Sequence, residues 1–369
     1  MSTVSWTEDN TCPTARWHSE NGALPPRFIV VVDDSTTADA ACRSARAGTG
    51  LLWRGDFHNA RQLLRAMGRR VERKVAPGGD PAEAFRRYRA SRRRRAHVLG
   101  KLLVVLEDDY SLALRRAPDV RRACTEAYGA PHGRMVVALT ELLGVLGAAQ
   151  WREKGVYVPA LRERIHPHYG VFSPVRGEYV DLVASAPLPA RVDSAFDLGT
   201  GTGVLAAILG RRGFRRIIAT DNNPRALSCA RANLDRLGLS SVAVHGPALF
   251  PDGKADLVVC NPPWLPGTPT SVLESGVYDE NSSMLHAFLS GLRAHLRPGG
   301  EGWLILSDLP EHLGLRPVGA LRDRISAAGL RITAQLTTHP THHRARNPSS
   351  PLHSARTRET TSLYRLTPS

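Results

Sequence analysis

The sequence predicts an α/β fold with a largely parallel sheet in residues 166–369, preceded by a mainly helical domain in residues 26–165. Two observations lead to this prediction. From about residue 166, candidate strands alternate with candidate helices, which is the order found in a parallel sheet covered by helices on both faces. Before that point, apolar residues recur mostly at helical spacing. With 369 residues, the chain is also long enough for two domains.

The N-terminal part begins without periodicity, so residues 1–25 are expected to be loose. "RFIVVVDD" (27–34) is β-branched and bounded by prolines and aspartates, which predicts a strand. After it the helical period predicts three helices, at residues 59–73, 98–117 and 135–151. The last of these is apolar nearly all round, so we expect it near the centre of the domain.

The C-terminal part supplies a series of short apolar runs between amphipathic segments. The candidate strands are "AFDLGTGTG", "RRIIATD", "SVAVHG", "ADLVVCN", "EGWLILSD", "LRITAQL" and "TSLYRL". Helix candidates such as "PRALSCARANLDRLG" and "SMLHAFLSGLRAHL" lie between them. This alternation predicts one sheet that carries the whole C-terminal domain.

Charge indicates a polyanionic partner such as nucleic acid or the ribosome, because the formal net charge is +15 and the sequence pI is near 10.3. A genome rich in G and C would also enrich arginine, and this alternative stays open. Seven arginines lie between residues 86 and 95. Two interpretations remain for this run: a solvated helix face, or a surface that grips RNA, DNA or an acidic protein.

The remaining composition favours a cytoplasmic protein. Five cysteines are scattered without a C-x-x-C pair, so we expect reduced thiols and neither a disulfide framework nor a metal site. No run of 18 apolar residues predicts a membrane span. The polar, acidic start "MSTVSWTEDN" does not have the pattern of a secretory signal.

A glycine-rich turn and a later acid indicate a nucleoside cofactor. "DLGTGTG" places Gly199, Thr200, Gly201 and Gly203 between a strand and a helix, where glycine permits positive φ and a close approach of the backbone to a ligand. The next strand ends in Asp221-Asn222, and a carboxylate at that place accepts hydrogen bonds from ribose hydroxyls.

The glycine spacing favours S-adenosylmethionine over a dinucleotide. Dinucleotide sites have G-x-G-x-x-G, whereas the third glycine here comes one residue early. Asp197, two residues before Gly199, would repel a pyrophosphate but suits the cationic amino group of a methionine moiety.

Three motifs follow one another along the chain: "FDLGTGTG", "ATDNNPRAL" and "ADLVVCNPPW". In these motifs and their order, the sequence resembles the class I S-adenosylmethionine-dependent methyltransferases of the small-domain type, which carry an Asn-Pro-Pro-aromatic signature. Release-factor glutamine N5-methyltransferases and N6-adenine methyltransferases are similar in kind. The resemblance covers residues 166–369 and does not extend to residues 1–165. It implies a Rossmann-like seven-stranded sheet, mostly parallel with the last strand reversed, and a macromolecular substrate, either nucleic acid or a ribosome-associated protein.

The Asn-Pro-Pro-Trp motif is expected to hold the methyl acceptor. An amide or base amino nitrogen is a poor nucleophile, and its N–H groups need acceptors. The Asn261 side-chain oxygen and the Pro262 carbonyl can each accept one N–H. Pro262 and Pro263 make the turn rigid, and Trp264 would stack on the planar group or close the pocket. The predicted activity is therefore N-methylation of a planar amino or amide group, without a general base.

Flanking segments complete the predicted cofactor site. In "SPVRGE", Pro174, Arg176 and Glu178 resemble, with altered spacing, a Pro-Arg-x-x-x-Glu-like stretch that lies over the cofactor in the glutamine methyltransferases. Tyr169 and Phe172 are candidates to cover the methionine end of the cofactor. The sequence departs from the family after the third strand, where Pro247 and Ala248 replace the acid that often meets the adenine. We expect the backbone, Leu249 and Phe250 to hold adenine instead.

Two alternatives remain at this stage. The chain could methylate a small metabolite, with residues 26–165 as a substrate lid. It could also be a catalytically silent nucleic-acid or ribosome-binding protein with the same fold, since the net charge and the missing acid would both suit that role. Fold alone does not decide between them. In the first hypothesis residues 26–165 recognise the macromolecular substrate.

Overall fold

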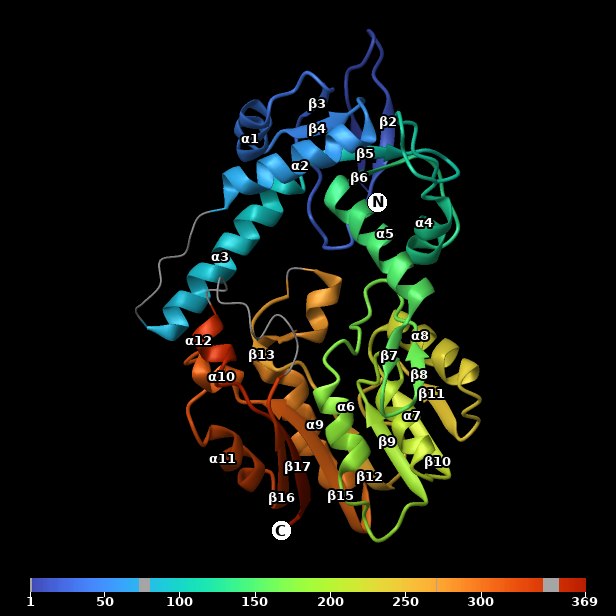
Figure 1. Ribbon diagram of the computed structural model, residues 1–369, viewed down its shortest axis with the longest axis vertical. Helices are drawn as coiled ribbons and strands as arrows, with labels where there is room; N and C mark the ends of the chain where they lie inside the picture. The colour runs from blue at the N-terminus through green and yellow to red at the C-terminus, as the bar shows by residue number, and fades with distance from the viewer. Residues whose placement is uncertain (1, 73–79, 270, 341–351) are drawn as a thin grey trace. The chain divides into compact units, whose positions relative to one another are not determined.

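The computed structural model describes residues 2–72, 80–269, 271–340 and 352–369. The chain divides into two compact units, residues 1–78 with 86–150 and residues 79–85 with 151–369, and each is built on its own sheet (Figure 1). The helices α3 (Pro81–Leu99) and α5 (Leu139–Lys154) run across these limits. The predicted boundary at 165/166 is therefore wrong by about one element, because the small hairpin of β7 (Val156–Val158) and β8 (Glu163–Ile165) belongs to the second unit.

The second unit contains the predicted seven-stranded sheet, with strand order β11-β10-β9-β12-β15-β17-β16. Its strands are β9 (Ser194–Leu198), β10 (Arg216–Thr220), β11 (Val242–His245), β12 (Ala255–Cys260), β15 (Leu296–Ser307), β16 (Leu330–Thr338) and β17 (Thr361–Pro368). The pairs among β11, β10, β9, β12 and β15 are parallel, whereas β17 is antiparallel to both β15 and β16. The predicted reversed last strand is confirmed, and the fold is Rossmann-like.

Two apolar layers cover this sheet, one on each face. Residues of α6, α7 and α8 pack with Ala195 and Val259 on one face. Residues of α9 and α11 pack with Phe196 and Val258 on the other, since neighbouring strand residues point to opposite faces. The helices of this unit are α6 (Glu178–Ser185), α7 (Val204–Arg211), α8 (Pro224–Arg236), α9 (Ser283–His295), α10 (Leu309–His312), α11 (Ala320–Ala327) and α12 (His353–Arg356).

The first unit holds a six-stranded sheet with the order β1-β2-β6-β5-β4-β3. Its strands are β1 (Thr3–Ser5), β2 (Thr14–Trp17), β3 (Ile29–Val32), β4 (Gly50–Trp53), β5 (Leu102–Leu106) and β6 (Met135–Ala138). The strands β3, β4 and β5 are parallel, and β5 pairs with β6 in the antiparallel direction. The helices are α1 (Ala38–Arg46), α2 (Phe57–Val71), α4 (Arg121–Tyr128) and parts of α3 and α5.

The prediction of a mainly helical N-terminal domain is wrong, because this sheet forms its core. The strand at 29–32 and the helix α2 are confirmed. However, residues 98–117 contain β5, and the apolar run from Met135 begins as β6 before α5 starts. Both strands are buried on both faces, so their sequences do not alternate, and short apolar runs of this kind cannot be told from buried helix by periodicity.

The prediction of a loose N-terminus is also wrong. Residues 3–5 and 14–17 pair as the antiparallel strands β1 and β2, and β2 pairs with β6. Val4, Trp6 and Ala15 are buried with residues of β4 and β5. Strands of three and four residues are too short to show a period, although the two tryptophans Trp6 and Trp17 suit a buried hairpin.

Candidate functional site

A cavity of about 240 Å³ lies at the carboxyl ends of β9, β10 and β12, within the second unit. Open parallel sheets bind ligands at this end. Predicted residues from all three strand ends line it: Gly199, Thr200, Gly201, Asp221, Asn222, Leu249, Asn261, Pro262, Pro263 and Trp264, together with Phe172. The structure therefore brings the glycine turn, the acid after the second strand and the Asn-Pro-Pro-Trp motif to one place.

The glycine turn has the backbone that its sequence requires. Gly199, Gly201 and Gly203 have φ of 70°, 56° and 83°, in the left-handed region that favours glycine. The Thr200 amide donates to the Thr220 carbonyl oxygen at 2.8 Å, which fixes the turn against the end of β10. A Cβ on Gly199 would lie 2.5 Å from the Met284 methyl group, so a side chain there would also displace α9 contacts.

Asp221 connects the turn to the end of β10. One carboxylate oxygen accepts the Gly201 amide at 3.0 Å, and the other accepts the Asn223 amide at 2.8 Å. Burial raises the pKa of this carboxyl, and the amide hydrogen bonds oppose that rise. Each oxygen keeps a further lone pair for a ligand hydroxyl.

Asp197 and Gly203 lie outside the cavity lining and support it from behind. Asp197 is 1% exposed, and one of its oxygens accepts hydrogen bonds from the Thr200 hydroxyl at 2.6 Å and the Ala206 amide at 3.0 Å. Burial raises the pKa of Asp197 to about 6. Gly203 precedes α7, and a Cβ there would lie 3.2 Å from the Ala230 backbone. Both residues shape the turn without lining the cavity.

The Asn-Pro-Pro-Trp motif begins where β12 ends at Cys260. The Trp264 indole N–H donates to Oδ1 of Asn261 at 2.8 Å, so the orientation of the asparagine amide is fixed inside the motif. Oδ1 keeps one lone pair, and the Pro262 carbonyl is the second acceptor that the sequence predicts. The next residue pair, β13 (Leu265–Pro266), is held by β14 (Tyr278–Asp279).

Arg176 lies over the motif and lines the cavity. Its guanidinium carbon lies 4.9 Å from the centroid of the Trp264 ring, at cation–π distance. Glu178 and Glu359, both nearly fully buried, hold the same guanidinium at 3.1 and 3.0 Å. Arg176, Trp264 and Asn261 thus form a chain of contacts along one wall of the cavity.

Two predicted cofactor residues lie elsewhere. The Phe250 ring stacks on His295 with centroids 4.2 Å apart, packs against α9, and does not line the cavity. Pro174 is also outside the lining. Ala248 does line it, at the place where the family often has an acid. Asp221 and Arg176 are the charged residues among those that line this cavity.

One wall of the cavity was not predicted from the sequence. It comes from the 3-10 helix η1 (Val272–Gly276) and the start of α9, which follows the short 3-10 turn η2 (Glu280–Ser282). The missed lining residues there are Ser275, Gly276, Val277 and Met284. Gly276 lies against Phe172, since a Cβ on it would be 2.7 Å from the Phe172 Cβ. In the sequence, the glycine in "LESGVY" was the available sign of a close contact here, but a single glycine does not indicate which residue approaches it.

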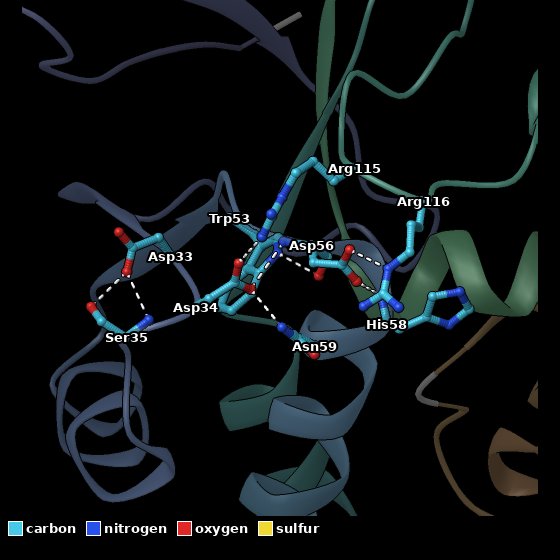
Figure 2. A network of polar contacts seen from close by, with 9 residues as sticks. All are labelled: Asp33, Asp34, Ser35, Trp53, Asp56, His58, Asn59, Arg115 and Arg116. Atoms are coloured by element: carbon cyan, nitrogen blue, oxygen red, sulfur yellow. Dashed lines mark hydrogen bonds and ion pairs between the residues drawn. The ribbon is translucent and has the colours of Figure 1, made fainter.

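A second polar network lies in the first unit, at the carboxyl ends of β3 and β4 (Figure 2). Asp34 accepts hydrogen bonds from the Asp56 amide, the Asn59 side chain and Arg115. Asp56 caps α2, and Arg116 holds its pKa at about 2. These carboxylates accept hydrogen bonds from protein groups, so the network ties three loops together.

In the described part of the chain, no group of three or more His, Cys, Asp or Glu side chains could hold a metal ion. Among those same residues, no helix is long and apolar enough to cross a membrane.

Residues 163–324 match the family model described as methyltransferase small domain. The release factor glutamine methyltransferase of Xylella fastidiosa (strain Temecula1) is 36% identical over 151 residues, which cover 36% of this chain and 51% of that protein. The ribosomal protein L11 methyltransferase of Clostridium perfringens (strain SM101) is 36% identical over 70 residues, covering 18% of this chain and 22% of that protein. The chain thus spans about half the length of the first of these relatives.

Solved structures are more distant. The ribosomal protein L11 methylase of Lactobacillus delbrueckii subsp. bulgaricus has a TM-score of 0.39 and 17% identity, covering 56% of this chain and 86% of that one. The family-model match falls within the second unit.

Proposed function

We propose that the protein transfers a methyl group from S-adenosylmethionine to a planar amide or amino nitrogen of a macromolecule, because residues 163–324 match the family model described as methyltransferase small domain. One observation carries the proposal: the Asn-Pro-Pro-Trp turn and the glycine turn with Asp221 line the same cavity. Hydrogen-bond acceptors for the nitrogen and groups for a nucleoside cofactor thus face one space.

The cavity residues fit that cofactor. Asp221 presents free lone pairs for ribose hydroxyls, and the positive φ of Gly199 and Gly201 leaves their backbone open to a ligand. Leu249 and Phe172 supply apolar surface for a flat base and an alkyl chain. When bound, the cofactor supplies an electrophilic methyl group on a positively charged sulfur.

The acceptor side needs only to hold and aim the nitrogen. Asn261 and Pro262 accept its two N–H groups, which leaves the remaining lobe of the nitrogen directed into the cavity. With the cofactor bound, the nitrogen would take its methyl group, forming one N–C bond as the S–C bond breaks, and a proton would leave the product to water. Positioning therefore supplies most of the rate enhancement, and no side chain is assigned as a general base.

A protein or nucleic acid that takes part in translation is the proposed acceptor. Relatives of this domain are named for a release factor and a ribosomal protein, which indicates a macromolecular target and a cytoplasmic reaction. The net charge of +15 suits a partner rich in phosphate. The first unit, which the family-model match leaves uncovered, is proposed to recognise that substrate.

Methyl transfer into a cell extract tests this proposal. Extract from cells lacking the protein is incubated with the purified chain and tritiated S-adenosylmethionine, and the products are digested with nuclease or with protease. The proposal expects label in one macromolecular fraction. Label in small molecules alone would favour a metabolite methyltransferase, and absence of both label and cofactor binding would indicate a silent binding protein.

The Trp264 indole N–H provides a narrower prediction. Trp264→Phe keeps an aromatic ring beside Arg176 but removes the donor to Asn261, so the asparagine amide is free to flip. We expect kcat to fall about 2- to 10-fold, the effect of one hydrogen bond, with the cofactor Kd unchanged. Steady-state kinetics and cofactor titration measure the two effects. An unchanged kcat would show that the hydrogen bond does not orient Asn261.

Asp197 makes cofactor affinity depend on pH. Its pKa of about 6 means that the carboxyl loses its charge as pH falls. The neutral form holds the Thr200 hydroxyl and the Ala206 amide less strongly, so the glycine turn beside the cavity loosens. Affinity should therefore weaken about tenfold between pH 7 and pH 5 in the parent protein. Calorimetric titration of Asp197→Asn should show a flat profile over that range; an equal slope in both proteins would remove Asp197 as the cause.

A further inference from the structure

Two helical segments of the first unit, in α2 and α3, carry positive charge without intervening acids. Residues 57–71 contain four arginines and residues 86–99 contain seven, and neither segment contains Asp or Glu. Exposed helix faces usually mix both signs, because opposite charges three or four residues apart stabilise a helix and like charges destabilise it. This pattern therefore lowers helix stability and calls for an external anion.

α2 and α3 meet to form one surface from these arginines. The Arg95 guanidinium donates to the Gly68 carbonyl oxygen at 2.6 Å, and a Cβ on Gly68 would lie 2.6 Å from it. Arg65 lies three residues before Gly68, and Arg92 lies three residues before Arg95. Residues at this spacing are neighbours on a helix surface, so both arginines lie beside the contact between α2 and α3. We call the exposed arginines around it the α2–α3 basic surface, namely Arg65, Arg69, Arg92, Arg93 and Arg94.

These five arginines have no carboxylate partner in the described part of the chain. Arg70, beside them on α2, shows the contrast, because it forms a 2.6 Å ion pair with Asp39. Arg95 is likewise engaged by the Gly68 backbone. The charges of the α2–α3 basic surface are thus solvated and available to a partner.

We propose that the α2–α3 basic surface docks RNA. Guanidinium groups bind phosphate through paired hydrogen bonds, which favours arginine for this task. Consecutive residues of a helix point about 100° apart, so Arg92, Arg93 and Arg94 project over more than half of the helix circumference. The phosphates of an RNA chain can contact arginines on several sides of α3 at once. A flat acidic protein surface would contact the arginines on one side of the helix only.

The width of the α2–α3 basic surface favours RNA over duplex DNA. The major groove of B-DNA admits one helix, but this charge spans two helices joined at Gly68 and Arg95. An RNA with single-stranded or irregular segments can follow such a surface. The inference extends the proposed function, since an acceptor on the ribosome is surrounded by RNA, yet RNA binding is measurable without methyl transfer.

The test is fluorescence anisotropy of a labelled RNA stem-loop with a single-stranded flank, titrated with the full chain over a series of salt concentrations. The variant Arg92→Glu/Arg93→Glu/Arg94→Glu should bind at least about 30-fold more weakly, and the slope of log Kd against log salt should fall by about 2. The variant Arg92→Gln/Arg93→Gln/Arg94→Gln should show an intermediate loss. Circular dichroism and cofactor titration check that each variant folds.

A matched control separates this surface from total charge. Arg191→Glu/Arg215→Glu/Arg331→Glu changes the net charge equally at exposed positions of the second unit and should leave RNA binding nearly unchanged. Equal losses in the control and the α3 variant would overturn the proposal. Equal affinity for duplex DNA of the same length, displacement of RNA by polyglutamate at a similar charge concentration, or no RNA binding by the parent would overturn it too. A parent that binds RNA but not S-adenosylmethionine would refute the proposed function and leave this inference intact.

Discussion

Asn261→Ala is expected to reduce kcat about 100- to 1000-fold while the Kd for S-adenosylmethionine stays unchanged. Asn261 lies at the end of β12, and its Oδ1 is oriented by the Trp264 indole N–H at 2.8 Å. Removing the amide deletes one of the two proposed acceptors for the attacking nitrogen and leaves the Trp264 donor without its Asn261 partner. Single-turnover methyl transfer and cofactor titration measure the two quantities.

Two further variants make this result interpretable. Asn261→Asp keeps an oxygen that accepts the Trp264 N–H, so it should retain more activity than Asn261→Ala. Asn21→Ala, at an exposed position of the first unit, should behave as the parent does. Parent-like turnover by Asn261→Ala, with the cofactor bound, would remove the Asn-Pro-Pro-Trp turn from the acceptor site.

Asp221→Ala should raise the Kd for S-adenosylmethionine about 10- to 100-fold, the effect of losing hydrogen bonds to a charged group. Its carboxylate also holds the Gly201 and Asn223 amides, so the glycine turn should loosen as well. Calorimetric titration measures the Kd, and saturating cofactor should recover much of the kcat.

The matched control is Asp235→Ala, which removes an exposed carboxylate from α8, the helix that begins three residues after Asp221. It should leave the cofactor Kd unchanged. If Asp221→Ala also binds the cofactor as the parent does, the nucleoside side of the proposed site lies elsewhere in the cavity.

The second unit could be predicted closely because its sequence signals are local. Gly199, Gly201 and Gly203 require positive φ, and Asp221 and Asn261 each follow a β-rich run. The carboxyl ends of neighbouring parallel strands meet at one edge, so these residues had to come together once the sheet order was assumed. That order and the reversed last strand came from the family resemblance, and periodicity did not supply them.

Contacts between distant segments could not be predicted in the same way. Arg176 reaches Trp264 and Glu359 through tertiary packing, over separations that no spacing rule covers. Phe250 has the composition of a cofactor contact, but its ring stacks on His295 of α9 instead. From an aromatic residue type we can predict burial, but not which side chains it will pack against, because those contacts depend on the whole fold.

The sheet of the first unit was missed for a different physical reason. β4 and β5 are buried on both faces, so their apolar residues do not alternate with polar ones. Long helices such as α2 and α3 dominate the pattern around them. Asp34 and Asp56 follow β3 and β4 in the sequence, but their structural role depends on ion pairs with Arg115 and Arg116, which the sequence does not reveal.

Mass spectrometry of the methylated product tests the central claim most directly. Macromolecules from cells lacking the protein are treated with the purified chain and isotopically labelled S-adenosylmethionine, and the labelled residue or nucleotide is then identified. We predict one added methyl group on the nitrogen of a planar amide or amino group, absent when Asn261→Ala replaces the parent. A methyl group found on oxygen, carbon or sulfur, or equal labelling by Asn261→Ala, would contradict the account.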